Sequence, residues 1–243
     1  MIFFITFQLT NLFTMKNRLL AILGVMLCCY SLNAQNEQWT VKPGEDVDTT
    51  LPADVKFHYP KFTQGYVFFR DGSVSGALLD YDMLSGKMQF IAPKGDTLEL
   101  ANEATIKYIV INNDTFFYDK VYMQLVAGNT TAKLSKKEKL RVLDIKKAGG
   151  YGGVSSTSAI ATVNTMRVNG QATSLTMQQE ITFTKETSYY IGDAFNHFLP
   201  ANKKNIIKLF GKKQNAIEQY LKDNKVEFNK EEDLKALISF LEG

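Results

Sequence analysis

Short apolar runs separated by turn residues fill the middle of the chain and limit the folds it can adopt. Between residues 57 and 122 these runs end at Asp71-Gly72, at Ser85-Gly86 and in segments 93–96 and 112–114. Asp-Gly and Asn-rich pairs suit tight turns that need a positive φ. The same stretch holds 13 aromatic residues, a concentration typical of strands. We therefore predict an antiparallel meander here.

Alternation within two of these runs predicts a sheet with one wetted face. Met88 and Phe90 alternate with polar residues, and so do Leu98 and Leu100. Successive side chains of a strand point to opposite faces of the sheet. We expect these four apolar residues to face the core.

Segment 134–147 fits two structures. Ser135 and Glu138 have the spacing of a capping box that opens a helix. Its apolar residues also fit a strand with a bulge, and we favour the strand. The Gly/Ser-rich segment 148–159 that follows is predicted to be a flexible connection. A mobile lid or an anion-binding nest is the alternative for that segment.

The β-rich pattern continues to about residue 200. Asn169-Gly170 lies between two strand-like runs and gives the clearest two-residue hairpin signal. Ile181 and Phe183 then alternate with threonines and predict a further strand.

The last 43 residues change to a helical pattern. Apolar residues recur at three- and four-residue steps among lysines and acids, and Gly211 is expected to break the first helix. Asn229 fits an N-cap, with Glu232 at the third helical position. The apolar stripe of the last helix consists of Leu234, Leu237, Ile238 and Leu241. It is expected to pack within the chain, and a groove for a partner is the alternative.

These patterns together predict an α+β fold. The β-rich domain spans 57–200, as a twisted sheet or an open barrel, and a C-terminal helical hairpin or short three-helix unit spans 201–243. Residues 35–56 are polar and contain proline and glycine. We predict that they form an extended lead-in in which Trp39 packs onto the domain edge.

The N-terminus has the order of a secretory signal. Positively charged residues at 16 and 18 precede an apolar stretch over 19–30, and Ala34 supplies the small residue of a cleavage site. We predict that 1–34 are a removable extension and signal, so that the mature chain begins at Gln35. The apolar run is short for a transmembrane helix, and an uncleaved anchor is the alternative. Residues 1–14 precede the positively charged residues of the signal, and we predict that translation starts at Met15, which leaves these residues out of the protein. The alternative is that residues 1–14 are part of a longer membrane anchor.

Both cysteines, Cys28 and Cys29, lie in the predicted signal. Leu27 stands where a lipoprotein signal requires a small residue, so lipid attachment is not favoured. The mature chain then has no thiol for a disulfide, a nucleophile or a zinc site. Loss of Lys16 and Arg18 lowers the formal net charge from +3 to +1. A net charge this small does not favour electrostatic binding of nucleic acid. No membrane span is expected after the signal is removed.

Few residues match the patterns of catalytic or metal sites. The two histidines, His58 and His197, belong to no H-E-x-x-H motif, and no G-x-S-x-G occurs. Asp80 and Asp82 face the same side of a strand and could hold a divalent cation. The following residues lack the glycine of a calcium loop, so we interpret the pair as a strand end entering a turn. We predict no catalytic residue, no metal site and no cofactor.

Three segments carry a resemblance to a group of proteins. They read GYVFFRDGSVSGALLDYDMLSGKMQFIAPKGDTLEL, GGYGGVSSTSA and FLPANKKNIIKLFGKKQNAIEQYLKDNKVEFNKEEDLKALISFL. The chain resembles uncharacterised exported proteins of Bacteroidota-type bacteria, which have a β-rich body and a lysine-rich helical tail. The resemblance implies a Gram-negative envelope location, periplasmic or outer-membrane-associated, and transfers no residue role. It also implies O-glycosylation of the motifs at 48–50 and 96–98.

Three functional hypotheses follow. The leading one is a non-catalytic exported envelope protein that binds a protein partner or a small ligand. The rival is an exported hydrolase with dispersed carboxylates or a serine, which convergence of the two histidines and two aspartates in one pocket would favour. The third is docking of the helical tail on another envelope protein. Burial of Leu234, Leu237 and Leu241 within the chain would weigh against the third.

Overall fold

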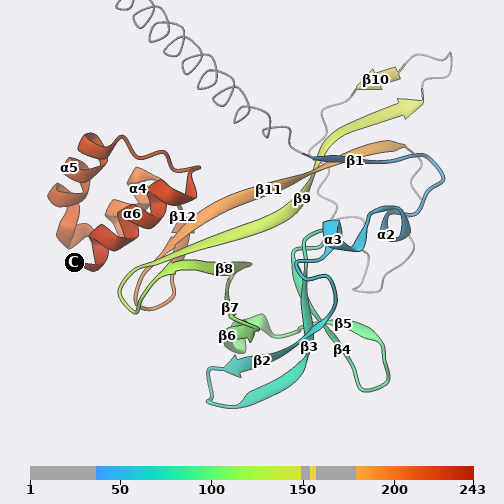
Figure 1. The fold of residues 1–243 in the computed structure, drawn as a ribbon, viewed down its shortest axis with the longest axis horizontal. Helices are drawn as coiled ribbons and strands as arrows, with labels where there is room; N and C mark the ends of the chain where they lie inside the picture. The colour runs from blue at the N-terminus through green and yellow to red at the C-terminus, as the bar shows by residue number, and fades with distance from the viewer. Residues whose placement is uncertain (1–36, 149–153, 157–178) are drawn as a thin grey trace, which may run out of the picture. The chain divides into compact units, whose positions relative to one another are not determined.

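The structure, a computed structural model, describes residues 37–148, 154–156 and 179–243. Residues Gln38–Gly243 form one compact unit. It has the predicted α+β fold, with a mostly antiparallel sheet that does not close into a barrel and with helices at its C-terminal end (Figure 1). The predicted signal and the predicted hairpin at Asn169-Gly170 lie outside the described residues.

Twelve strands of the described residues form one sheet. They are β1 (Gln38–Val41), β2 (Thr63–Phe69), β3 (Val74–Asp82), β4 (Lys87–Ile91), β5 (Thr97–Glu99), β6 (Ile106–Ile111), β7 (Asp114–Asp119), β8 (Val121–Gly128), β9 (Lys133–Ala148), β10 (Val154–Ser156), β11 (Glu180–Gly192) and β12 (Phe198–Pro200). The helices are α2 (Val47–Thr50), α3 (Ala53–Lys56), α4 (Lys203–Leu209), α5 (Gln214–Asn224) and α6 (Glu231–Glu242), with 3₁₀ turns η1 (Glu103–Thr105) and η3 (Gly211–Lys213).

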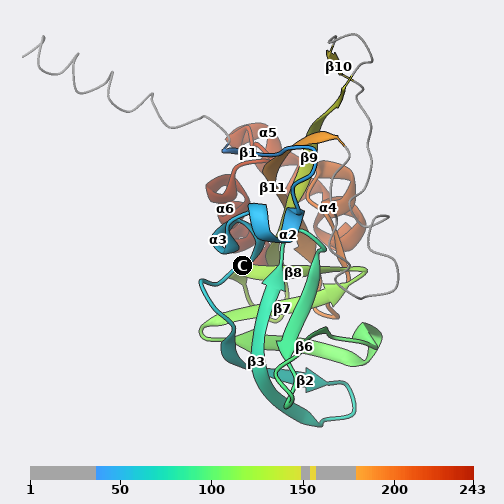
Figure 2. The same ribbon diagram turned by 90° about the vertical axis from the view of Figure 1, so that its right-hand side faces the viewer.

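The sheet consists of two meanders joined side by side. Its order is β1-β11-β9-β8-β7-β6-β2-β3-β4-β5, with β10 added to β9 and β12 added to β11. The chain thus runs through β2 to β5 and then returns, so that β6 pairs with β2. Strand twist accumulates over several strands, and β3 runs across β8 in Figure 2 as a result.

Segment 134–147 is a strand, as favoured from the sequence. β9 pairs antiparallel with β11 over most of its length, and the register shifts between Thr182 and Phe183. Leu143 is the extra residue opposite this shift and is 43% exposed. The capping-box alternative for Ser135 and Glu138 is therefore wrong, because the long ladder with β11 satisfies the backbone of this segment.

One face of the bent sheet carries the main core. Leu79 and Tyr81 from β3, Ile109 from β6, Phe116 from β7 and Tyr122 from β8 are all nearly or fully buried there. The predicted turns lie between these strands, and Gly72, Gly86 and Gly95 have positive φ in them.

The expected alternation in β4 and β5 is only partly present. Met88 is fully buried, but Leu98 is 48% exposed, so its predicted core position is wrong. β5 is a three-residue edge strand whose only neighbour among the described strands is β4, so one side of Leu98 is left uncovered there. Gln89 is buried because its side-chain amide donates to Asp82 Oδ2 at 3.1 Å.

The lead-in is more ordered than the sequence suggested. Residues 38–41 form β1 and pair with β11 at one edge of the sheet, and α2 and α3 follow. Trp39 lies on this edge strand and packs partly buried against the main core, as predicted.

The C-terminal helices surround a second core. Leu234, Leu237, Ile238 and Leu241 of α6 are buried there with Ile206, Ile217 and Leu134. Helix α4 ends before Gly211, as predicted. Helix α6 begins at Glu231 with Lys230 at its N-cap, so the predicted Asn229 cap is wrong by one residue. Three acidic residues in the first turn of α6 favour its N-terminus electrostatically instead.

Candidate functional site

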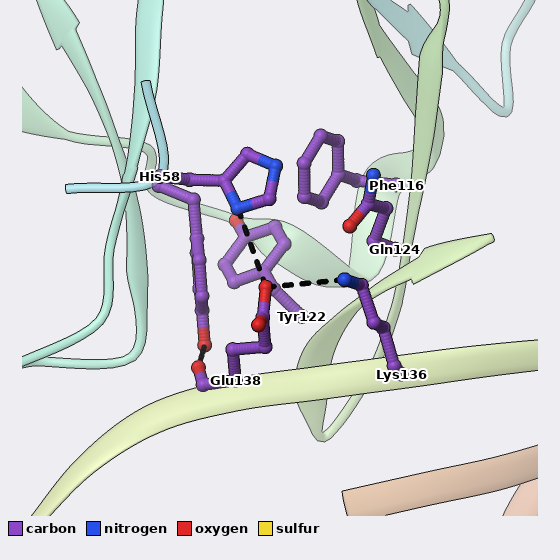
Figure 3. A pocket seen from close by; sticks show the side chains of 7 residues that line it. His58, Phe116, Tyr122, Gln124, Lys136 and Glu138 are labelled. Atoms are coloured by element: carbon purple, nitrogen blue, oxygen red, sulfur yellow. Dashed lines mark hydrogen bonds and ion pairs between the residues drawn. The ribbon is translucent and has the colours of Figure 1, made fainter. Parts of the chain in front are cut away.

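A small pocket opens on the core face of the sheet, where α3 leads into β2. Its lining residues are His58, Tyr81, Phe116, Tyr122, Gln124, Lys136 and Glu138, and we call it the Glu138 pocket (Figure 3). The empty space, including the open mouth, is about 190 Å³. Its enclosed part has room for about one water-sized group.

Strand pairing brings the lining residues together. Phe116 lies opposite Gln124 across β7 and β8, and Gln124 lies opposite Lys136 across β8 and β9. These three side chains therefore form a row over three neighbouring strands. His58 completes the pocket from the segment after α3, where its backbone N–H donates to the Tyr81 carbonyl at 3.0 Å.

Glu138 is the electrostatic centre of the pocket. Its Oε2 lies 3.5 Å from His58 Nδ1 and 3.5 Å from Lys136 Nζ, and its Oε1 lies 3.4 Å from Lys185 Nζ. The hydrogen bond from His58 and the charges of the two lysines outweigh partial burial and lower the pKa of Glu138 from 4.5 to about 2. Glu138 is therefore firmly ionised at neutral pH and is a weak base.

Two buried polar atoms in the pocket lack a partner among the described residues. Tyr122 is 1% exposed, and its hydroxyl makes no hydrogen bond there. Gln124 Nε2 donates to Asp114 Oδ1 at 2.7 Å, which fixes the amide because a carboxylate only accepts. Gln124 Oε1 is left without a donor and points toward the pocket in Figure 3. An unpaired buried polar group costs about 1–3 kcal/mol.

The lining residues offer hydrogen-bonding groups that a ligand could use. None of the seven lining residues is a serine, threonine or cysteine that could act as a nucleophile. The one carboxylate in the lining has a pKa far below neutral pH, so it accepts a proton poorly. The unpaired donor at Tyr122 and acceptor at Gln124 can instead hold a polar group of a ligand.

The predicted aspartate pair lies outside the pocket lining. Both carboxylates are buried near the end of β3, and Asp82 accepts from the backbone N–H groups of Leu84 and Ser85. This is the strand end entering a turn that the sequence indicated. Asp80 accepts from the backbone N–H groups of Tyr59 and Tyr81. Burial raises the pKa of Asp80 from 3.8 to about 6 in spite of these hydrogen bonds.

The structure separates the two histidines. His58 is packed in the pocket, with its ring 5.6 Å from that of Phe116 in an edge-on arrangement. His197 lies on an exposed turn and contacts Asp193 Oδ2 through Nδ1 at 3.2 Å. Of the four residues expected to converge in an enzyme site, only His58 lines the pocket.

Sequence reasoning missed the other polar residues of this site. Glu138 stands out in the sequence only as an acid among lysines, and its spacing from Ser135 indicates a helix cap rather than a pocket residue. Tyr122 and Gln124 carry no motif, because their relation to Glu138 depends on the pairing of β8 with β9. Knowledge of that register is the only signal that could have grouped them.

Comparison of the chain with protein-family models, with curated proteins and with solved structures finds no match. Among the residues that the structure describes, no three histidine, cysteine or acidic side chains gather as metal ligands would. No helix in the described ranges is long and apolar enough to span a bilayer.

Proposed function

We propose that this chain is an exported, non-catalytic envelope protein of a Gram-negative bacterium that binds a small polar ligand in the Glu138 pocket. The observation that carries the binding function is the pair of unpartnered buried atoms, Tyr122 Oη and Gln124 Oε1. The order of charged, apolar and small residues before Gln35 supports export. The resemblance to exported Bacteroidota-type proteins agrees with this location.

The pocket favours a neutral group that can both donate and accept a hydrogen bond. Glu138 and Lys136 place opposite charges in the lining, so neither an anion nor a cation is strongly preferred. A ligand hydroxyl can accept from Tyr122 Oη and donate to Gln124 Oε1. Because the enclosed space holds about one water-sized group, the ligand would insert one end and leave the rest in the mouth.

Replacing Tyr122 by phenylalanine tests this assignment. We expect Tyr122→Phe to raise the free energy of unfolding without ligand by about 1 kcal/mol, because an unpaired buried hydroxyl is removed. The same substitution should weaken binding of small polyols and monosaccharides by about tenfold, since one hydrogen bond is lost. Urea unfolding and NMR titration of the labelled tyrosine rings measure the two effects.

Tyr118→Phe is the matched control. Tyr118 lies directly opposite Tyr122 across β7 and β8, with ring centroids 4.9 Å apart, but it does not line the pocket. The Tyr118→Phe substitution should therefore leave the binding of polyols and monosaccharides unchanged. A loss of stability in Tyr122→Phe would mean that the hydroxyl is already paired, and it would contradict the proposal.

A further inference from the structure

The segment that enters the helical unit carries an unbalanced positive charge. Residues 194–217 contain five lysines and no aspartate or glutamate. All five lie in α4 and η3 and are exposed. Lys213 Nζ donates to the Leu241 carbonyl at 2.9 Å, near the C-terminal end of α6, so this lysine has a structural role.

The other four lysines, Lys203, Lys204, Lys208 and Lys212, form what we call the α4 lysine patch. None of them makes an ion pair within the described ranges of the chain. By contrast, Lys230 and Lys235 of the same helical unit pair with Glu227 and Glu231. The patch thus concentrates positive charge that no ion pair of the described residues offsets, although acidic residues outnumber lysines in the rest of the helical unit, residues 218–243.

The position of these lysines opposes the stability of α4. Lys203 and Lys204 lie in the first turn, where the partial positive charge of the helix N-terminus disfavours cations. Lys204 and Lys208 are four residues apart, which places like charges side by side. Ile206 is fully buried, so the rotation of the helix is fixed and the lysines remain in solvent. Charge placements that destabilise a helix in this way are found most often at functional surfaces.

We infer that the α4 lysine patch is a surface that binds anionic lipid membranes through their phosphate headgroups. Lysines on an exposed helix can reach several headgroups at once, whereas a single anion needs an enclosed site. Ile207, Leu209 and Phe210 of the same segment are only partly buried. These apolar side chains fit the boundary between headgroups and acyl chains better than the surface of an acidic protein. The inference does not depend on the Glu138 pocket.

Sedimentation with lipid vesicles tests the inference. The protein used in this assay should begin at Gln35, because the apolar stretch 19–30 would itself bind lipid. Wild type should bind vesicles of phosphatidylglycerol and phosphatidylcholine, but not vesicles of phosphatidylcholine alone, and high salt should release it. Changing all four patch lysines to glutamine should weaken binding by a factor of roughly 600, since each basic residue at an anionic surface contributes a factor of about five.

A control variant keeps the same net charge as the patch variant. It changes four exposed lysines outside the patch that make no ion pair in the described structure, namely Lys42, Lys61, Lys94 and Lys222. This control should lose less than about threefold in affinity, as expected of lysines that do not face the membrane. Circular dichroism should show both variants folded.

Three results would overturn the inference. Equal weakening in the two variants would mean that net charge, and not the patch, governs binding. Release of the protein from the vesicles by millimolar inorganic phosphate would indicate a site for a single anion. Equally tight binding of soluble polyglutamate would indicate an acidic polypeptide as the partner.

Discussion

Glu138→Gln should lower the free energy of unfolding by about 3 kcal/mol at neutral pH. The expected size follows from the pKa of Glu138, which is lowered from 4.5 to about 2 in the folded protein. The side chain is only 13% exposed, so solvent screens its interactions weakly. The substitution leaves His58, Lys136 and Lys185 without their shared carboxylate. Urea unfolding of the chain from Gln35 measures the effect.

The stabilisation by Glu138 has a defined pH dependence. A folded-state pKa below the unfolded value means that the contribution is complete above about pH 4.5 and is lost as pH falls toward 2. The difference between wild type and Glu138→Gln should therefore disappear between pH 5 and pH 2. Glu227→Gln is the control, because the Glu227–Lys230 pair is exposed and screened by solvent and should therefore contribute little to stability. A constant difference down to pH 2 would contradict the assignment.

Asp80→Asn should have the opposite pH dependence. The pKa of Asp80 is raised from 3.8 to about 6 by burial, so the folded protein binds a proton more tightly than the unfolded chain. Wild type should consequently lose stability as pH rises from about 4 to 6. The stability of Asp80→Asn relative to wild type should increase by about 2 kcal/mol between pH 4 and pH 7.

The amide of Asp80→Asn keeps the oxygen that accepts from the backbone N–H groups of Tyr59 and Tyr81. The NH₂ group of the new amide replaces Asp80 Oδ2, a buried oxygen that has no partner among the described residues. Asp96→Asn changes an exposed carboxylate and is the matched control, with no change in the pH profile expected. A flat difference between Asp80→Asn and wild type would show that the buried carboxylate is not destabilising.

The local signals of the sequence were sufficient for the meander strands and for the C-terminal helices, but not for β1, α2 and α3 of the lead-in. Asp71-Gly72 and Asn112-Asn113 mark turns because the backbone geometry there needs residues that tolerate positive φ, as Gly72 and Asn112 do. The buried stripe of α6 follows from helical spacing alone. Complete burial of Leu234, Leu237 and Leu241 within the chain also weighs against the helical tail as a docking element.

Long-range pairing was not available from these signals. The return of the chain from β5 to place β6 beside β2 has no local mark, because any exposed strand edge can accept a partner. The Glu138 pocket depends on such pairing, since its residues come from β3, β7, β8 and β9 and the segment after α3. The histidines and aspartates can be recognised as candidate site residues by their type alone. Tyr122 and Gln124 can be recognised only from their neighbours in the folded sheet.

Export of the chain is the proposal on which both its expected location in the envelope and the expected absence of thiols from the mature chain depend. Fractionation of the producing cell with N-terminal sequencing of the purified protein tests this claim most directly. The account predicts recovery from the envelope fractions of a chain whose first residue is Gln35. An intact chain beginning at Met1 or Met15 among the soluble proteins of the cytosol would contradict it.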